Sequence, residues 1–122
     1  MKIWLAIGSA FSGLGVMLGA FGAHALKARL EPAMLEIFEV GVRYQMYHAL
    51  GLLAVAFAAS QIKHGCIAAA GWLFVSGILI FSGSLYTLSL SGIRWLGAIT
   101  PIGGVCFIAG WACLVWGALA SR

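Results

Sequence analysis

Residues 3–26, IWLAIGSAFSGLGVMLGAFGAHAL, contain no Lys, Arg, Asp or Glu. Three later stretches are also free of charge, and they cover residues 44–62, 64–93 and 95–121. A helix crosses a bilayer with about 20 mostly apolar residues, and each stretch is about that long or longer. The sequence therefore predicts an all-α fold, an integral membrane bundle of four transmembrane helices over about residues 3–23, 44–62, 67–90 and 98–120.

The composition of the chain agrees with this architecture and limits the classes of function. Of the 122 residues, 63% are hydrophobic and 8% are charged, whereas soluble domains carry about 25% charged residues. A chain of this length forms one domain, so we expect residues 1–122 to make a single four-helix transmembrane domain. The net charge of +4 comes from basic residues dispersed among loops and ends. Such residues are typical of topological anchors and do not indicate nucleic-acid binding.

The connection between the first two spans differs in character from the rest of the chain. Residues 27–43 hold six of the ten charged residues. Glu31-Pro32 is typical of a helix start, because proline at the first helical position loses no hydrogen bond. Apolar residues then recur on one face, with charged residues on the other. We expect a short amphipathic helix over about residues 32–43, lying in the membrane interface and running into the second span.

Small residues recur along one face of the first and last spans at spacings of three, four or seven. Within a membrane, glycine allows the backbone of a neighbouring helix to approach closely. The pattern therefore predicts closely packed helix interfaces, and the glycines to which we assign this role are Gly8, Gly15, Gly19, Gly22, Gly103, Gly110 and Gly117.

Polar residues within the spans gather in one half of the predicted bundle. Four antiparallel spans would place them on the membrane side opposite the termini, and the candidate cluster is His24, Tyr44, Gln45, His48, Ser84 and Tyr86. Polar groups in hydrocarbon need partners, so the favoured interpretation is that these side chains hydrogen-bond one another. A ligand or ion site and a two-histidine metal site, which would need a third ligand, are the alternatives.

The sequence contains no motif that indicates a catalytic site. The chain has no GxSxG motif and no aspartate, and its glutamates all lie in the first connection. A Ser-His-acid assembly would have to draw on that connection. We predict that the protein is not an enzyme and has no catalytic residues, no metal site and no cofactor.

The orientation of the chain follows from four spans and the positions of Lys and Arg. Both termini would lie on one side, and the lysine and arginine counts favour neither side clearly; we place both termini in the cytoplasm. Ala23-His24-Ala25 has the pattern of a signal-peptide cleavage site, but the preceding apolar segment is longer than the about 7–15 residues of a signal peptide. We therefore expect the first helix to be retained.

Several short motifs resemble those of a known family. They are residues 19–24 (GAFGAH), 44–50 (YQMYHAL), 81–86 (FSGSLY), 100–104 (TPIGG) and 110–111 (GW). In combination they are similar to the signature blocks of small membrane proteins known as the domain of unknown function 423 family. The resemblance implies a four-span protein of bacterial inner membranes with no established activity, cofactor or substrate.

The sequence therefore predicts a small polytopic inner-membrane protein with a non-enzymatic, structural or accessory role. The partners that we expect are the lipid bilayer and either a second copy of the chain or another membrane protein. The alternative is a transporter or a small-molecule or lipid-binding protein that uses a polar half-membrane pocket opposite the termini.

Overall fold

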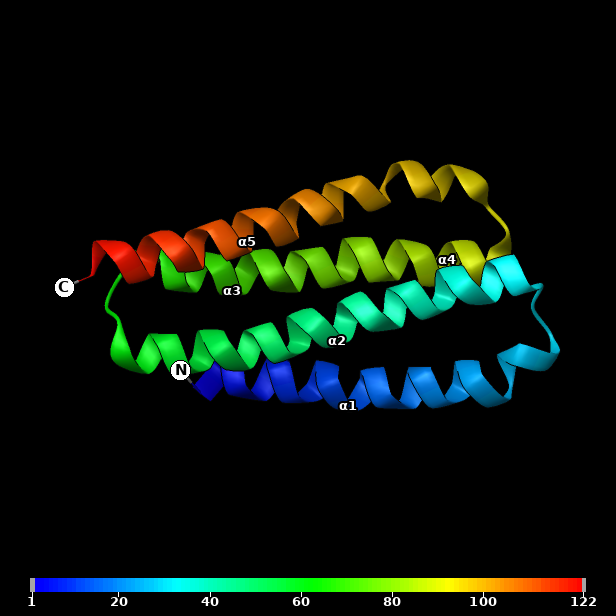
Figure 1. The fold of residues 1–122 in the computed structure, drawn as a ribbon, viewed down its shortest axis with the longest axis horizontal. Coiled ribbons are helices and arrows are strands. Elements are labelled where there is room, and N and C mark those ends of the chain that lie inside the picture. Colours follow the sequence, from blue (N-terminus) through cyan, green and yellow to red (C-terminus); the bar gives the residue numbers. More distant parts are fainter. Residues whose placement is uncertain (1, 122) are drawn as a thin grey trace.

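Antiparallel helical rods make up the computed structural model, which describes residues 2–121 (Figure 1). The all-α prediction is confirmed, since these residues form no strand. The elements in chain order are α1 (Lys2–His24), η1 (Leu26–Ala28), α2 (Pro32–Gln61), α3 (Gly65–Gly77), η2 (Ile78–Ser82), α4 (Gly83–Ser91), η3 (Arg94–Ala98) and α5 (Thr100–Ala120).

Three helical segments are long and apolar enough to cross a membrane, and they cover Lys2–Ala28, Gly65–Ser91 and Arg94–Ala120. They match the first, third and fourth predicted spans to within a few residues. Helix α2 is not among them, because the uncharged part of α2 begins with the polar residues Tyr44, Gln45, Tyr47 and His48, which lower its mean hydropathy.

The predicted interfacial helix over residues 32–43, running into a span over residues 44–62, is not confirmed as a separate element. The structure has one continuous helix, α2, from Pro32 to Gln61. Its buried face continues across the expected boundary, with Phe38 and Gly41 before it and Gln45 and His48 after it. This three- and four-residue repeat keeps one face against the bundle, so the chain has no reason to bend there.

Helix α2 lies between α1 on one side and the rod formed by α3, η2 and α4 on the other. Helix α5 packs along that same rod, which leaves α1 and α5 as the outer helices (Figure 1). Both described ends of the chain, at α1 and α5, lie beside the α2–α3 connection (Figure 1).

The rod from Gly65 to Ser91 contains one irregular turn. Segment η2 is π-helical and separates α3 from α4, a feature found frequently at functional sites. The rod begins where the His64 ring nitrogen Nδ1 accepts a hydrogen bond from the Cys66 backbone N–H at 3.1 Å. It ends at Gly92, whose φ of 74° is open to glycine at no steric cost.

The core is apolar and aromatic, and the glycines bring its helices together. At Gly103, a Cβ atom would lie 2.8 Å from the Phe81 Cα, which means that α5 touches the backbone of η2. Gly8 likewise lies against the backbone of α2 at Ala49. Gly15, Gly22, Gly110 and Gly117 are also buried, whereas Gly19 is half-buried and leaves ordinary contact distance to Val42. The buried core residues are Trp4, Leu52, Val55, Ala56, Ile67, Ala70, Phe74, Ile78 and Phe107.

Candidate functional site

Gln45 lies at the centre of the bundle and connects three helices. Its side chain is 2% exposed. The amide Nε2 donates to the Phe11 carbonyl of α1 at 2.9 Å, and Oε1 accepts from the Tyr86 hydroxyl of α4 at 2.6 Å. Gly15 lies beside this bond, where an added Cβ would be in ordinary contact with Nε2 at 3.4 Å and would meet the flexible side chain of Met46.

The Tyr86 ring is held in place by a second close approach. It lies on Gly41 of α2, where a Cβ atom would come within 2.8 Å of the ring carbon Cε1. Its other neighbour is Phe38, with the ring centroids 5.0 Å apart. The hydroxyl of Tyr86 is therefore aimed at Gln45 by the packing of its ring, so this bond joins two rigid elements.

His48 makes a second bridge, from α2 to α5. Its Nδ1 lies 2.8 Å from the Tyr44 carbonyl oxygen, and its Nε2 accepts from the Trp111 indole N–H at 3.0 Å. A carbonyl only accepts and an indole N–H only donates, so Nδ1 carries the proton and Nε2 does not. The geometry assigns a neutral imidazole with both nitrogens engaged. The ring stacks on Phe107 with centroids 3.5 Å apart and planes 6° from parallel.

Two serines tie the η2–α4 segment to its neighbours. Ser82 is fully buried and donates to the Gly41 carbonyl of α2 at 2.6 Å. Ser84 donates to the Phe81 carbonyl at 2.9 Å, and its oxygen lies 2.6 Å from the Thr100 hydroxyl at the start of α5. Either hydroxyl can be the donor in this pair, because the Thr100 hydroxyl also lies 3.4 Å from the Leu96 carbonyl oxygen.

His24 does not join the other predicted residues. It is exposed at the last turn of α1. Gly22 lies beside Phe38, and His48 follows Phe38 by ten residues, or about 15 Å along the helix axis. The two histidines thus lie at different depths of the bundle. Among residues 2–121, no group of three His, Cys, Asp or Glu side chains is placed to hold a metal ion.

A cavity of about 380 Å³ opens beside the His48–Trp111 bridge, between α2 and α5. Tyr44 contributes an aromatic wall, with its ring centroid 4.8 Å from that of Phe81. The polar atoms of His48 and Trp111 are already bonded to each other, so the cavity offers mainly aromatic and aliphatic surface. Its lining residues are Tyr44, His48, Phe81, Gly104, Phe107, Ile108 and Trp111.

The predicted cluster thus divides into separate contacts, and some of their members were not predicted. Gln45 and Tyr86 bond directly, His48 pairs with Trp111, and Ser84 pairs with Thr100. Trp111 could have been found from the sequence, because a tryptophan in the middle of a span needs an acceptor for its N–H. No feature of the sequence indicates that the Phe11 carbonyl is an acceptor for Gln45.

Comparison with known proteins places the chain among membrane proteins. A family model described as "Protein of unknown function (DUF423)" matches residues 18–104. The UPF0382 membrane protein YwdK of Bacillus subtilis is 49% identical over 94% of each chain. A UPF0382 membrane protein of Staphylococcus saprophyticus is 47% identical over 96% of this chain and 97% of its own. No solved structure matches. The resemblance seen in the sequence motifs is thereby confirmed.

Proposed function

The chain belongs to the DUF423 family of membrane proteins of unknown function, and on that premise we propose a non-enzymatic structural or accessory role. In this proposal the protein is a multi-pass component of a bacterial inner membrane and crosses it four times. Both termini lie in the cytoplasm. Its action is to present a rigid helical surface to another membrane protein or to a second copy of itself.

The fourth crossing in this proposal is α2. Its uncharged part, residues 44–61, rises about 27 Å as a helix, close to the hydrocarbon thickness of about 30 Å. It lies antiparallel to α1, whose length and composition suit a span. The polar side chains that lower its hydropathy include Gln45 and His48, which face the bundle and are buried. A helix with its polar groups turned inward and satisfied is compatible with lipid on its outer face.

The observation that carries the proposed role is the internal pairing of the buried members of the polar cluster, Gln45, His48, Ser84 and Tyr86. Gln45 bonds to α1 and α4, and His48 bonds to α5 and to its own helix. Within residues 2–121, no buried side-chain nitrogen or oxygen lacks a hydrogen-bond partner. Side chains bonded in this way hold the helices in fixed positions. This pairing therefore favours a structural role for the cluster over a reactive role.

Crosslinking in native membranes tests this role. Photocrosslinking amino acids at the exposed α1 positions Val16 and Met17 and at the exposed α5 positions Ile108 and Val115 cover both outer helices. We expect at least one position to give a discrete crosslinked band, containing either a second copy or one membrane protein. The absence of any discrete band from both helices would contradict the proposal.

The cavity between α2 and α5 favours a second candidate function, the binding or transport of a small apolar molecule or lipid. Gly104 provides the test, because a Cβ there would stay 3.9 Å or more from Phe81 and a larger side chain would enter the cavity. If this function holds, Gly104→Leu abolishes a ligand that co-purifies with the wild type in native mass spectrometry. The control is Gly13→Leu, at a site in α1 with open space. The second candidate fails if no small molecule is retained by the wild type.

A further inference from the structure

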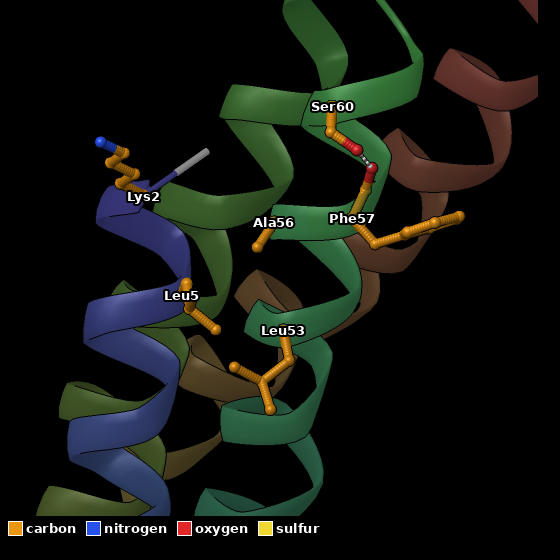
Figure 2. A pocket seen from close by; sticks show the side chains of 6 residues that line it. All are labelled: Lys2, Leu5, Leu53, Ala56, Phe57 and Ser60. Atoms are coloured by element: carbon orange, nitrogen blue, oxygen red, sulfur yellow. Dashed lines mark hydrogen bonds between the residues drawn. The ribbon is translucent and has the colours of Figure 1, made fainter.

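A second cavity, of about 300 Å³, lies between α1 and α2 at the end of the bundle that holds the termini. Figure 2 shows Leu5 of α1 and Leu53 of α2 pointing toward one another, with the methyl group of Ala56 directed into the same space. Lys2 stands at the upper rim and extends away from these apolar side chains. We call this cavity the Lys2 groove, and its lining residues are Lys2, Leu5, Leu53, Ala56, Phe57 and Ser60.

The groove results from how α1 meets α2. The two helices touch closely at Gly8, where a Cβ would lie 2.9 Å from the Ala49 carbonyl oxygen. One turn before Gly8, the large side chain of Trp4 is buried against Gly71 of α3 and does not fill the space beside α2. Ala56 is too small to fill it from the other side. The cavity is therefore open at the surface of the bundle and lined by carbon.

The groove opens on a part of the molecule that would face lipid in the four-span arrangement. Leu5 is 53% exposed and Phe57 is 69% exposed, and both lie in uncharged stretches. The Ser60 hydroxyl is already engaged, because it donates to the Phe57 carbonyl at 2.6 Å and accepts from the Gln61 amide. Lys2 thus provides the polar group at the rim that is free to meet a ligand.

Within residues 2–121, the charged side chains at this end of the bundle are all basic. Lys2 and Lys63, in the α2–α3 connection, are exposed there. All three acidic residues, Glu31, Glu36 and Glu39, lie in the α1–α2 connection and the first turns of α2, at the opposite end. Among the described residues, no carboxylate side chain therefore competes for Lys2. An apolar groove beneath an unopposed ammonium group matches a molecule with a hydrocarbon chain and an anionic head.

We propose that the Lys2 groove binds an acidic phospholipid, with one acyl chain between Leu5 and Leu53 and the phosphate against Lys2. The site is separate from the polar cluster around Gln45 and His48. A lipid in this groove would contact both α1 and α2 at one end of their interface. From Gly8 onward the two helices contact each other directly.

Native mass spectrometry of the full chain in detergent tests the charge of the proposed ligand. The probes are dioleoylphosphatidylglycerol and dioleoylphosphatidylcholine, which share their acyl chains and differ in net charge. A lysine near an anionic lipid surface contributes enough to favour the acidic lipid about fivefold. We expect Lys2→Gln to remove this preference and Lys63→Gln, outside the groove, to retain it. Equal retention of both lipids by the wild type, or equal effects of the two variants, would overturn the proposal.

A second pair of variants tests the groove itself. Leu5→Trp places a larger side chain in the cavity, and Ile3→Trp introduces the same residue at a site of similar exposure that does not line it. We expect Leu5→Trp to lose the bound phosphatidylglycerol peak and Ile3→Trp to keep it. Retention of the lipid by both variants would show that the acyl chain does not occupy the groove and would refute the proposed site.

Discussion

The bond between Tyr86 and Gln45 gives the sharpest test of internal pairing. Tyr86→Phe removes only the hydroxyl that donates to Gln45 Oε1 at 2.6 Å. The acceptor is then left without this donor in a side chain that is 2% exposed. A buried polar group without a partner costs about 1–3 kcal/mol, and measured hydrogen bonds between membrane helices reach about 1.7 kcal/mol. We expect a loss of about 1.5 kcal/mol in the free energy of unfolding.

A double-mutant cycle separates this bond from other effects of the substitutions. Gln45→Leu removes the bonds to both Tyr86 and Phe11, so we expect a loss of about 2–3 kcal/mol, at about 1–1.5 kcal/mol for each bond. In the Gln45→Leu background the Tyr86 hydroxyl has no partner in this bond to lose. Adding Tyr86→Phe there should therefore cost almost nothing, which corresponds to a coupling energy of about 1–1.7 kcal/mol.

Reversible unfolding in mixed micelles with increasing denaturing detergent, followed by circular dichroism, measures these free energies. The matched control is Tyr47→Phe, since the Tyr47 side chain is 53% exposed on α2. Additive losses in the double variant, or a Tyr86→Phe loss no larger than that of Tyr47→Phe, would refute the reasoning that this bond braces the helices.

Two further predictions use the same unfolding measurement. Gly103→Ala should destabilise the fold by about 1–3 kcal/mol, because the added methyl group would press on the backbone of Phe81. The control, Gly13→Ala, has open space around it and should not destabilise the fold. Equal losses of stability in the two variants would contradict this explanation. Trp111→Phe leaves the Nε2 of His48 without its donor and should cost about 1–3 kcal/mol. A neutral effect of Trp111→Phe would show that the α2–α5 bridge contributes nothing.

The helical fold was predictable because the uncharged stretches leave few alternatives. Backbone polar groups in lipid must be satisfied within a segment, so a long apolar stretch is a helix. An interfacial helix over residues 32–43 was expected because these residues hold charges and the uncharged stretch begins at residue 44. Charge determines which face meets water, but the buried repeat of Phe38, Gly41 and Gln45 determines where the helix continues. Periodicity across residue 43 was the better guide.

The pairing within the candidate site was less accessible from the sequence. The positions of Gln45, His48 and Tyr86 were noticed because polar residues are unusual in a span, and helix periodicity placed the first two on one face. Which groups they bond depends on helix rotation and on the close approach at Gly41, which allows the Tyr86 ring to come near. Those contacts join residues 34 and 41 positions apart, and no local pattern specifies them.

Whether α2 crosses the membrane is central to this account, and labelling single cysteines tests it directly. With Cys66, Cys106 and Cys113 replaced by alanine, one cysteine is introduced at exposed positions near the helix ends, at Lys2, Lys27, Lys63 or Arg94. A membrane-impermeant maleimide is then applied to spheroplasts before and after permeabilisation. Four spans with cytoplasmic termini predict labelling of Lys27→Cys and Arg94→Cys from outside, and of Lys2→Cys and Lys63→Cys only after permeabilisation. Labelling of Lys27→Cys and Lys63→Cys from the same side would show that α2 does not cross and would contradict the account.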